Sequence, residues 1–242
     1  MKYFDIEYVK TKSLSEFCFT LTKSSAAARF SEEYYSSLYR KCLKEYQNET
    51  KRICRFLKKP YDKELTASEF TQSNTENIEY VKQNLPKEIL ECVADVRVLA
   101  LGAASPEVFD KITSFCGKLY RKCRETENLY EAELEKVKNK FGAEKTDMLL
   151  KCLFATPKDA YTEGDSLIIT VDSDNTGDVL KNRIIFSSPA DIMGIDFVGQ
   201  AVCQVELLPA ENDSLHLNCL FYQPKDGIYT EFSVYAKNFS FE

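Results

Sequence analysis

The spacing of apolar residues changes near residue 150, and this change constrains the fold of the 242-residue chain more than any other feature. Before that point apolar residues recur every three or four positions, as they do on the buried face of an amphipathic helix. After it they alternate or form short β-branched and aromatic runs, which is typical of strands. The sequence therefore predicts an α+β protein with a helical domain over residues 1–147 and an all-β domain over residues 148–242.

The first part predicts a helical bundle with one long helix. Apolar periodicity indicates helices over about 31–58 and 87–101, and a polar loop over 61–74. A further helix begins at Pro106 and continues for about 35 residues, or roughly 50 Å at 1.5 Å per residue. A helix of that length can form the spine of the bundle.

The second part predicts five or six strands separated by turn residues. One of these strands is expected at 150–155. No segment between the strands is long enough for a crossover helix, so the sheet should be mainly antiparallel. The predicted architecture is a β sandwich or an open barrel.

Charge divides the chain at the same place. Residues 1–150 hold 26 Lys and Arg against 24 Asp and Glu, whereas residues 151–242 hold 6 against 14. A net charge of −8 in the strand-rich part attracts basic partners and disfavours polyanions. We therefore expect a basic protein partner and no nucleic acid, and interpret the basic run from Lys51 to Lys63 as a solvated helix face.

Nine cysteines lie scattered among apolar residues, with no Cys-x-x-Cys pair. Such thiols behave as small apolar groups in a reducing compartment, so the sequence predicts a cytoplasmic protein with no metal or cofactor. The charged opening segment does not resemble a secretory signal, and no apolar run of 18 residues is present. We therefore expect no membrane partner.

Asp172, Asp174 and Asp178 form the one clustered set of acids in the strand-rich part, and are candidate binding residues. Their alternate spacing, with Gly177, resembles the start of a calcium loop. The twelfth position, however, is Arg183, where a bidentate glutamate is needed. The segment is therefore predicted to be a polar hairpin turn, with weak calcium binding as the alternative.

Arg97 is a further candidate binding residue. On a helix over 87–101 its neighbours three and four positions away are apolar, so its charge needs a carboxylate from a distant segment. Asp95, two positions away, should point to a different side. The prediction is a structural ion pair, and the alternative is an anion-binding arginine.

No catalytic motif is present in the sequence. The chain lacks the nucleophile elbow, zinc-protease, dinucleotide and phosphate-loop signatures. The one histidine, His216, alternates with Leu215 and Leu217 and is expected to be a surface or edge residue of a strand. The sequence therefore predicts no catalytic residues.

Several segments resemble an uncharacterised bacterial family built on a domain of unknown function. They are the opening Met1-Lys2-Tyr3-Phe4, the run from Phe30 to Tyr34, Asn84-Leu85-Pro86-Lys87-Glu88-Ile89-Leu90, and the run from Val93 to Gly102. Members often carry a His-Asp pair where this chain has Leu150-Lys151. The resemblance implies a bacterial cytoplasmic protein, and it implies no activity and no site.

Taken together, these features favour a non-enzymatic binding protein, regulatory or immunity-like, whose acidic β part contacts a basic partner. The alternative is a hydrolase that acts through the carboxylates of Asp172, Asp174 and Asp178. A deep pocket lined by acids would favour the enzyme, and an exposed apolar patch would favour the binder.

Overall fold

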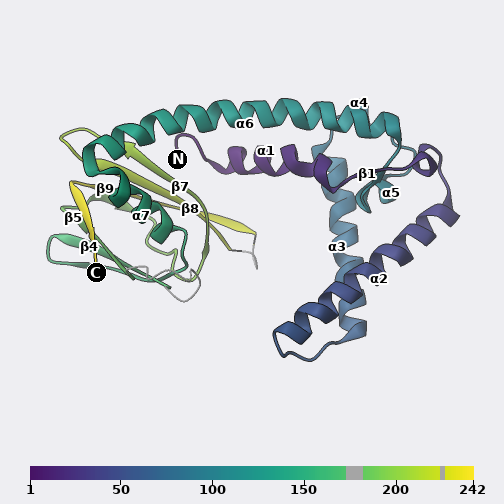
Figure 1. Ribbon diagram of the computed structural model, residues 1–242, viewed down its shortest axis with the longest axis horizontal. Coiled ribbons are helices and arrows are strands. Elements are labelled where there is room, and N and C mark those ends of the chain that lie inside the picture. Colours follow the sequence, from purple (N-terminus) through teal and green to yellow (C-terminus); the bar gives the residue numbers. More distant parts are fainter. Residues whose placement is uncertain (173–181, 224–226) are drawn as a thin grey trace. The chain divides into compact units, whose positions relative to one another are not determined.

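The computed structural model of the protein describes residues 1–172, 182–223 and 227–242 (Figure 1). Contacts divide the chain into two compact units. One consists of Ser13–Tyr120 and is called the helical unit, and the other consists of Met1–Lys12 with Arg121–Glu242 and is called the β unit. An N-terminal helical region and C-terminal antiparallel sheets confirm the predicted α+β class. Separate domains over 1–147 and 148–242 stay a prediction, and that boundary falls within helix α7 (Ala143–Leu153).

The helical unit contains mainly helices joined by short connections. Its elements are the end of α1 (Ile6–Glu16), η1 (Phe17–Thr20), β1 (Thr22–Lys23), η2 (Ser25–Ala28), α2 (Glu32–Phe56), α3 (Lys63–Asn84), α4 (Lys87–Leu90), α5 (Val96–Ala100), β2 (Ala103–Ala104) and the start of α6 (Pro106–Phe141). The long helix predicted from Pro106 is therefore confirmed. Strands β1 and β2 pair in parallel, which the sequence did not predict.

Capping side chains set where α2 and α3 begin. The Ser31 hydroxyl accepts the N–H of Tyr34, which starts α2 within the range predicted from the sequence. The Asp62 carboxylate accepts the N–H groups of Glu64 and Leu65, so α3 begins at Lys63. The polar loop predicted over 61–74 is therefore wrong, because α3 is a mostly solvated helix without a broad apolar stripe.

The single helix predicted over 87–101 is also wrong. The chain forms α4 and α5 instead, separated by residues 91–95. Asp95 has an extended backbone and caps α5 by accepting the N–H of Arg97. The break places Asp95 outside the helix, and this changes its orientation relative to Arg97.

The core of the helical unit gathers around the start of α6. Its buried members are Leu21, Val81, Leu85, Ile89, Leu99, Ala104, Val108, Ile112 and Cys116. Gly102 has a φ of +83°, and a side chain there would come within 2.9 Å of the Thr20 carbonyl oxygen. The absence of a side chain lets the Thr22 N–H donate to the Gly102 carbonyl at 2.8 Å, which leads into the β1–β2 pairing.

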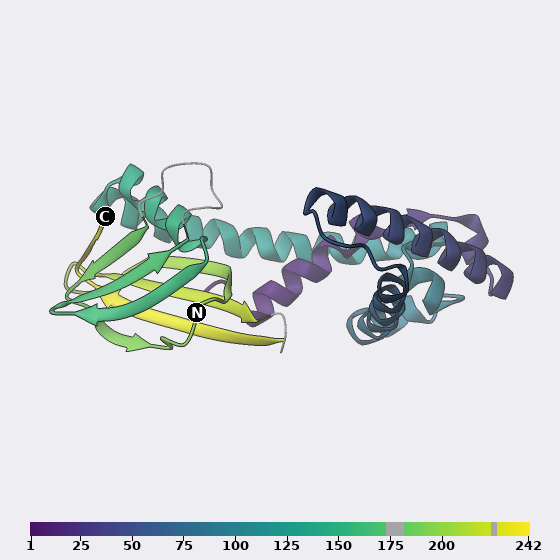
Figure 2. The ribbon, with the colours of Figure 1, turned by 90° about the horizontal axis from the view of Figure 1, so that it is seen from below.

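Two four-stranded antiparallel sheets form most of the β unit, as can be followed in Figure 2. The first has the order β10–β5–β4–β3 and the second β6–β9–β8–β7. Their strands are β3 (Pro157–Glu163), β4 (Ser166–Val171), β5 (Arg183–Ser187), β6 (Ala190–Met193), β7 (Ala201–Pro209), β8 (Leu215–Gln223), β9 (Ile228–Ala236) and β10 (Asn238–Phe241). Every strand pair in these two sheets is antiparallel, as predicted.

Side chains from both sheets share one core, so the β unit is a sandwich. Leu167 and Phe186 from the first sheet belong to the same buried cluster as Leu217 and Phe232 from the second. Helix α7 adds Leu149, Cys152 and Leu153 to this cluster. The strand predicted at 150–155 is therefore wrong, because residues 150–153 continue α7 and place these side chains at helical spacing.

A buried carboxylate attaches the first residues of the chain to the β unit. Glu206 on β7 is fully buried, and its oxygens accept the N–H groups of Lys2, Tyr3 and Phe4 at 2.9, 2.6 and 2.6 Å. Three donors compensate for the loss of water around this charge. Phe4 then packs against the ring of Tyr130.

In the parts of the chain that are described, none of the helices has the length and apolar character needed to cross a bilayer.

Candidate functional site

Arg97 lies in a closed set of contacts within the helical unit. Its guanidinium donates to Asp95 Oδ2 and to Glu32 Oε2, each at 2.8 Å. The ring of Tyr35 stacks on it, with the centroid 4.1 Å from Cζ. The distant carboxylate predicted from the sequence is thus present as Glu32, but it is exposed.

The expectation that Asp95 points away from Arg97 is wrong. Only 5% of the Asp95 side chain is exposed, and the break before α5 aims it at the guanidinium. Burial acts to raise the pKa of Asp95, but hydrogen bonds from Arg97 overcome this and lower it. The guanidinium already contacts two carboxylates and the Tyr35 ring. The geometry therefore favours a structural ion pair over an anion-binding site.

The predicted acidic cluster can be placed only in part. Asp172 follows β4, and its carboxylate lies 3.0 Å from Nζ of Lys158. Asp174 and Asp178 lie outside the described residues. In the described part of the chain, no three His, Cys, Asp or Glu side chains are grouped as metal ligands. Asp172 is therefore seen as one member of an ion pair with a lysine of β3.

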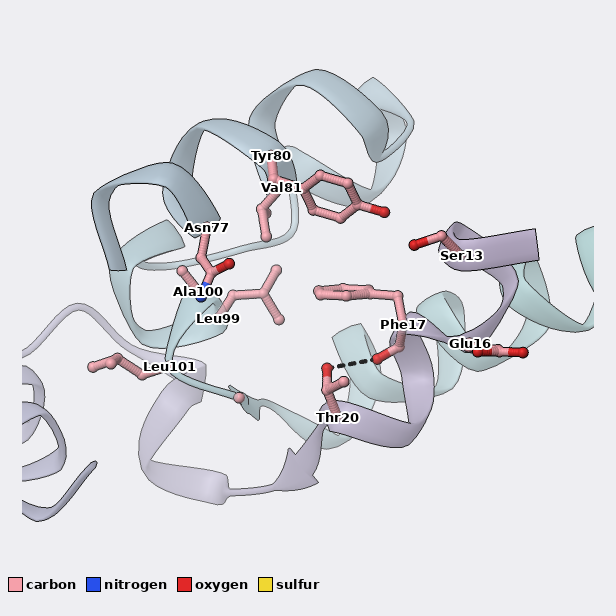
Figure 3. A pocket seen from close by; sticks show the side chains of 11 residues that line it. Ser13, Glu16, Phe17, Thr20, Asn77, Tyr80, Val81, Leu99, Ala100 and Leu101 are labelled. Atoms are coloured by element: carbon pink, nitrogen blue, oxygen red, sulfur yellow. Dashed lines mark hydrogen bonds between the residues drawn. The ribbon is translucent and has the colours of Figure 1, made fainter. Parts of the chain in front are cut away.

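A cavity of about 490 Å³ lies within the helical unit between η1, α3 and α5. Figure 3 shows the Phe17 ring projecting between Leu99 and Tyr80, while the Glu16 carboxylate points away. The Thr20 hydroxyl already donates a hydrogen bond to the Phe17 carbonyl oxygen. The cavity is thus lined about equally by polar and apolar groups, and among the described contacts none of its hydroxyls is hydrogen-bonded to the Glu16 carboxylate.

His216 was expected to be a surface or edge residue; it is not on an edge strand, but it is only half-buried and lines a cavity. It lies on β8, between β7 and β9, with its ring stacked on Tyr235 at a centroid distance of 3.9 Å. Its Nε2 lies 2.8 Å from Oγ of Ser233, and burial lowers the pKa of His216. Ser233 is buried and does not line the neighbouring cavity of about 790 Å³, so the pair does not present a nucleophile to it.

Helix α2 is a long but sparsely covered element of the helical unit. None of its 25 residues is buried, although its apolar side chains share one face. Near its start, Tyr34, Tyr35 and Leu38 pack against small buried residues, and further along Tyr39 and Tyr46 contact Phe70 of α3. Beyond Tyr46 the apolar face continues to the end of the helix with little cover.

The closed end of the α2–α3 hairpin carries a patch of exposed apolar and basic side chains, called here the apex patch. Its apolar members are Ile53, Phe56, Leu57 and Leu65, which are 48%, 85%, 51% and 58% exposed. Its basic members are Lys51, Arg55, Lys58, Lys59 and Lys63, all exposed and, among the described residues, in no ion pair. The patch therefore combines apolar surface with a surplus of positive charge.

The backbone at the apex is strained. Lys58 has a φ of +54° and ends α2, where its N–H donates to Arg55 and that of Lys59 donates to Cys54. This pattern is a Schellman motif, in which glycine is the favoured residue. A lysine in the left-handed region costs about 1 kcal/mol relative to glycine. Lysine is thus present at a position where stability alone favours glycine.

Sequence reasoning missed the apex patch. It predicted a helix over about 31–58 with its apolar side chains on one face, and interpreted the basic run from Lys51 to Lys63 as solvated. The signal available was the run Phe56-Leu57-Lys58-Lys59-Pro60, which places two large apolar residues between cations just before a helix-breaking proline.

The chain matches no protein-family model, no curated protein and no solved structure. Its resemblance to the uncharacterised bacterial family therefore stays a prediction.

Proposed function

We propose that this protein is a non-catalytic binding protein that docks a partner through the apex patch. The observation that supports this most is the exposure of Phe56 and Leu57 beside the lysines of the apex patch. Single exposed apolar residues are ordinary on protein surfaces, but a contiguous group rimmed by charge is typical of an interaction site.

The cavity in the helical unit adds little support for an enzyme, because its lining has a single carboxylate, which points away from the space (Figure 3). The cavity beside His216 has three carboxylates in its lining, those of Glu133, Asp191 and Glu211, but the hydroxyl that contacts His216 belongs to Ser233, which does not line it. A hydrolase acting through Asp172, Asp174 and Asp178 remains the alternative, but the Asp172 carboxylate is paired with Lys158. An exposed apolar patch is the feature expected of the binder.

The acid surplus of residues 151–242 supports a second contact, with a basic protein partner. A protein with one basic, apolar surface and one acidic surface can hold two different partners. This arrangement suits a regulatory or immunity-like role in the cytoplasm, which stays part of the proposal.

Site-specific photo-crosslinking in living cells tests the docking surface. A photoreactive amino acid replaces Phe56 in the full chain, and in a matched control it replaces Phe19, which is 81% exposed in the same unit but outside the apex patch. We expect discrete adducts from position 56 and none from position 19. Equal crosslinking from both positions, or none from position 56, would contradict the proposed function.

A further inference from the structure

We infer that the apex patch docks on the surface of an anionic lipid bilayer. The inference rests on the proposed function and names the chemistry of the partner. It depends on the apolar residues of the patch, on its charge and on its size.

The apolar residues have the arrangement of a helix that lies in a bilayer interface. Ile53, Phe56 and Leu57 are three and four positions apart and therefore share one face of α2. Lys51 and Arg55 are four positions apart on the opposite face, and Lys58 lies just beyond the end of the helix. Interfacial helices place Phe and Leu at the acyl boundary and Lys and Arg at the headgroups in this way.

The charge of the apex patch favours lipid phosphates and carboxylates. Of the acids beside the patch, Glu49 pairs with Arg52 at 2.6 Å, Asp62 accepts two N–H groups at the start of α3, and Glu64 is exposed. The five basic side chains of the patch are all exposed and outnumber Asp62 and Glu64, so the patch has a surplus of positive charge. Attraction to an anionic surface grows with each such cation.

The size of the patch favours a bilayer over a folded protein. Figure 1 shows α2 and α3 meeting at the turn between them, so the patch occupies the closed end of the hairpin. It contains nine residues, four apolar and five basic. A specific protein interface takes about 20–30 residues on each side, whereas a few apolar anchors with flanking cations are enough for reversible binding to a membrane surface.

This inference departs from the expectation of no membrane partner. That expectation came from the absence of an apolar run long enough to span a bilayer, and the finding on the described helices likewise concerns spanning. Docking on the surface requires no spanning helix, only apolar side chains that reach the headgroup boundary.

Vesicle co-sedimentation of the full chain tests the inference. One vesicle preparation is phosphatidylcholine alone and the other also contains phosphatidylserine. We expect binding to the phosphatidylserine vesicles only. Binding should weaken when salt rises from about 0.1 M to about 1 M, because the Debye length falls from about 10 Å to about 3 Å.

Matched variants locate the contact. Lys58→Glu with Lys59→Glu should lower partitioning at least about 25-fold, because each lysine near an anionic surface contributes about fivefold. Phe56→Ser with Leu57→Ser should also lower it strongly. The controls Lys87→Glu with Lys118→Glu, and Phe19→Ser, change exposed residues outside the apex patch and should leave partitioning within about threefold of the unchanged chain.

The outcomes separate this inference from the proposed function. Absence of binding to phosphatidylserine vesicles, equal binding to phosphatidylcholine vesicles, or full binding by the apex variants would overturn the lipid partner. If position 56 still crosslinks to a protein in that case, the docking function stands and only the lipid is wrong. If position 56 also fails to crosslink, both proposals fall.

Discussion

The helical unit contains a long element without a buried residue, and the described part of the β unit does not. In the β unit, residues from both sheets and from α7 form one continuous buried cluster. In the helical unit, α2 spans 25 residues without a buried one. A strand needs neighbours to satisfy its backbone hydrogen bonds, whereas a helix satisfies its own. A helix can therefore form with one face half covered, and the apex patch lies at the end of such a helix.

The two units also differ in how they use charge. In the β unit the buried Glu206 holds the N–H groups of three residues, so the charge is part of the structure. At the end of α2 the lysines have no ion-pair partner among the described residues. The comparison suggests that substitutions in the β unit should cost stability and that substitutions at the apex patch should cost binding.

Truncating one phenylalanine in each unit should give the largest difference in stability between the two units. Phe186 is fully buried in the sandwich, so Phe186→Ala should lower the free energy of unfolding by about 3–5 kcal/mol. Phe56→Ala removes a side chain that is 85% exposed and should change it by less than about 0.5 kcal/mol. Urea unfolding measures both, and equal losses would mean that the apex patch is covered.

Removing Arg97 should have an intermediate effect. Arg97→Met leaves Asp95, whose side chain is nearly buried, without its partner, and it also frees Glu32. We expect a loss of about 2–3 kcal/mol, less than for a fully buried pair because the guanidinium is partly exposed. Arg52→Met, which breaks the exposed pair with Glu49, should cost less than about 1 kcal/mol. A loss of less than about 1 kcal/mol for Arg97→Met would show that its ion pair contributes little to stability.

Acid should reduce the difference in the free energy of unfolding between the Arg97→Met variant and the unchanged chain. The pKa of Asp95 is lowered in the folded protein from an ordinary value of 3.8. A depressed carboxyl pKa stabilises the fold above the unfolded value, and the contribution is lost as pH falls through the folded value. The stability gap should therefore be constant from about pH 5 to pH 7 and shrink below about pH 4. A gap that widens in acid would contradict the assignment.

Relieving the strain at the apex should have a small effect of the opposite sign, a gain in stability. Lys58→Gly should raise the free energy of unfolding by about 0.5–1 kcal/mol, because glycine adopts a φ of +54° without penalty. Lys58→Ala removes the same charge but keeps Cβ, and it should give no such gain. Equal changes in the two variants would show that charge, and not backbone strain, is being measured.

Periodicity in the sequence predicted the faces of the elements but not what covers them. Leu167, Ile168 and Ile169 form an apolar run because β4 is buried on both faces there, and the strand follows from that pattern. Ile53 and Leu57 keep helical spacing equally well, yet α3 does not cover them. The sequence pattern also did not predict the capping role of Asp62. This residue begins helix α3 where the polar composition suggested a loop.

The candidate site residues were recovered unevenly for related reasons. Arg97 was expected to find a carboxylate far away in sequence, and Glu32 is one. Its buried partner Asp95 was excluded, because a continuous helix was assumed where the chain breaks. The contact between His216 and Ser233 depends on the pairing of β8 with β9, which alternation alone does not specify.

The most direct test measures stability and docking on the same variant. Phe56→Ser with Leu57→Ser in the full chain should leave the melting temperature within about 2 °C, since a change of 1 kcal/mol shifts it by about 2–4 °C at this size. The same sample should lose binding to phosphatidylserine vesicles, while Phe19→Ser keeps both properties. A melting temperature lowered by many degrees with binding intact would show that these side chains stabilise the fold and that the docking surface lies elsewhere.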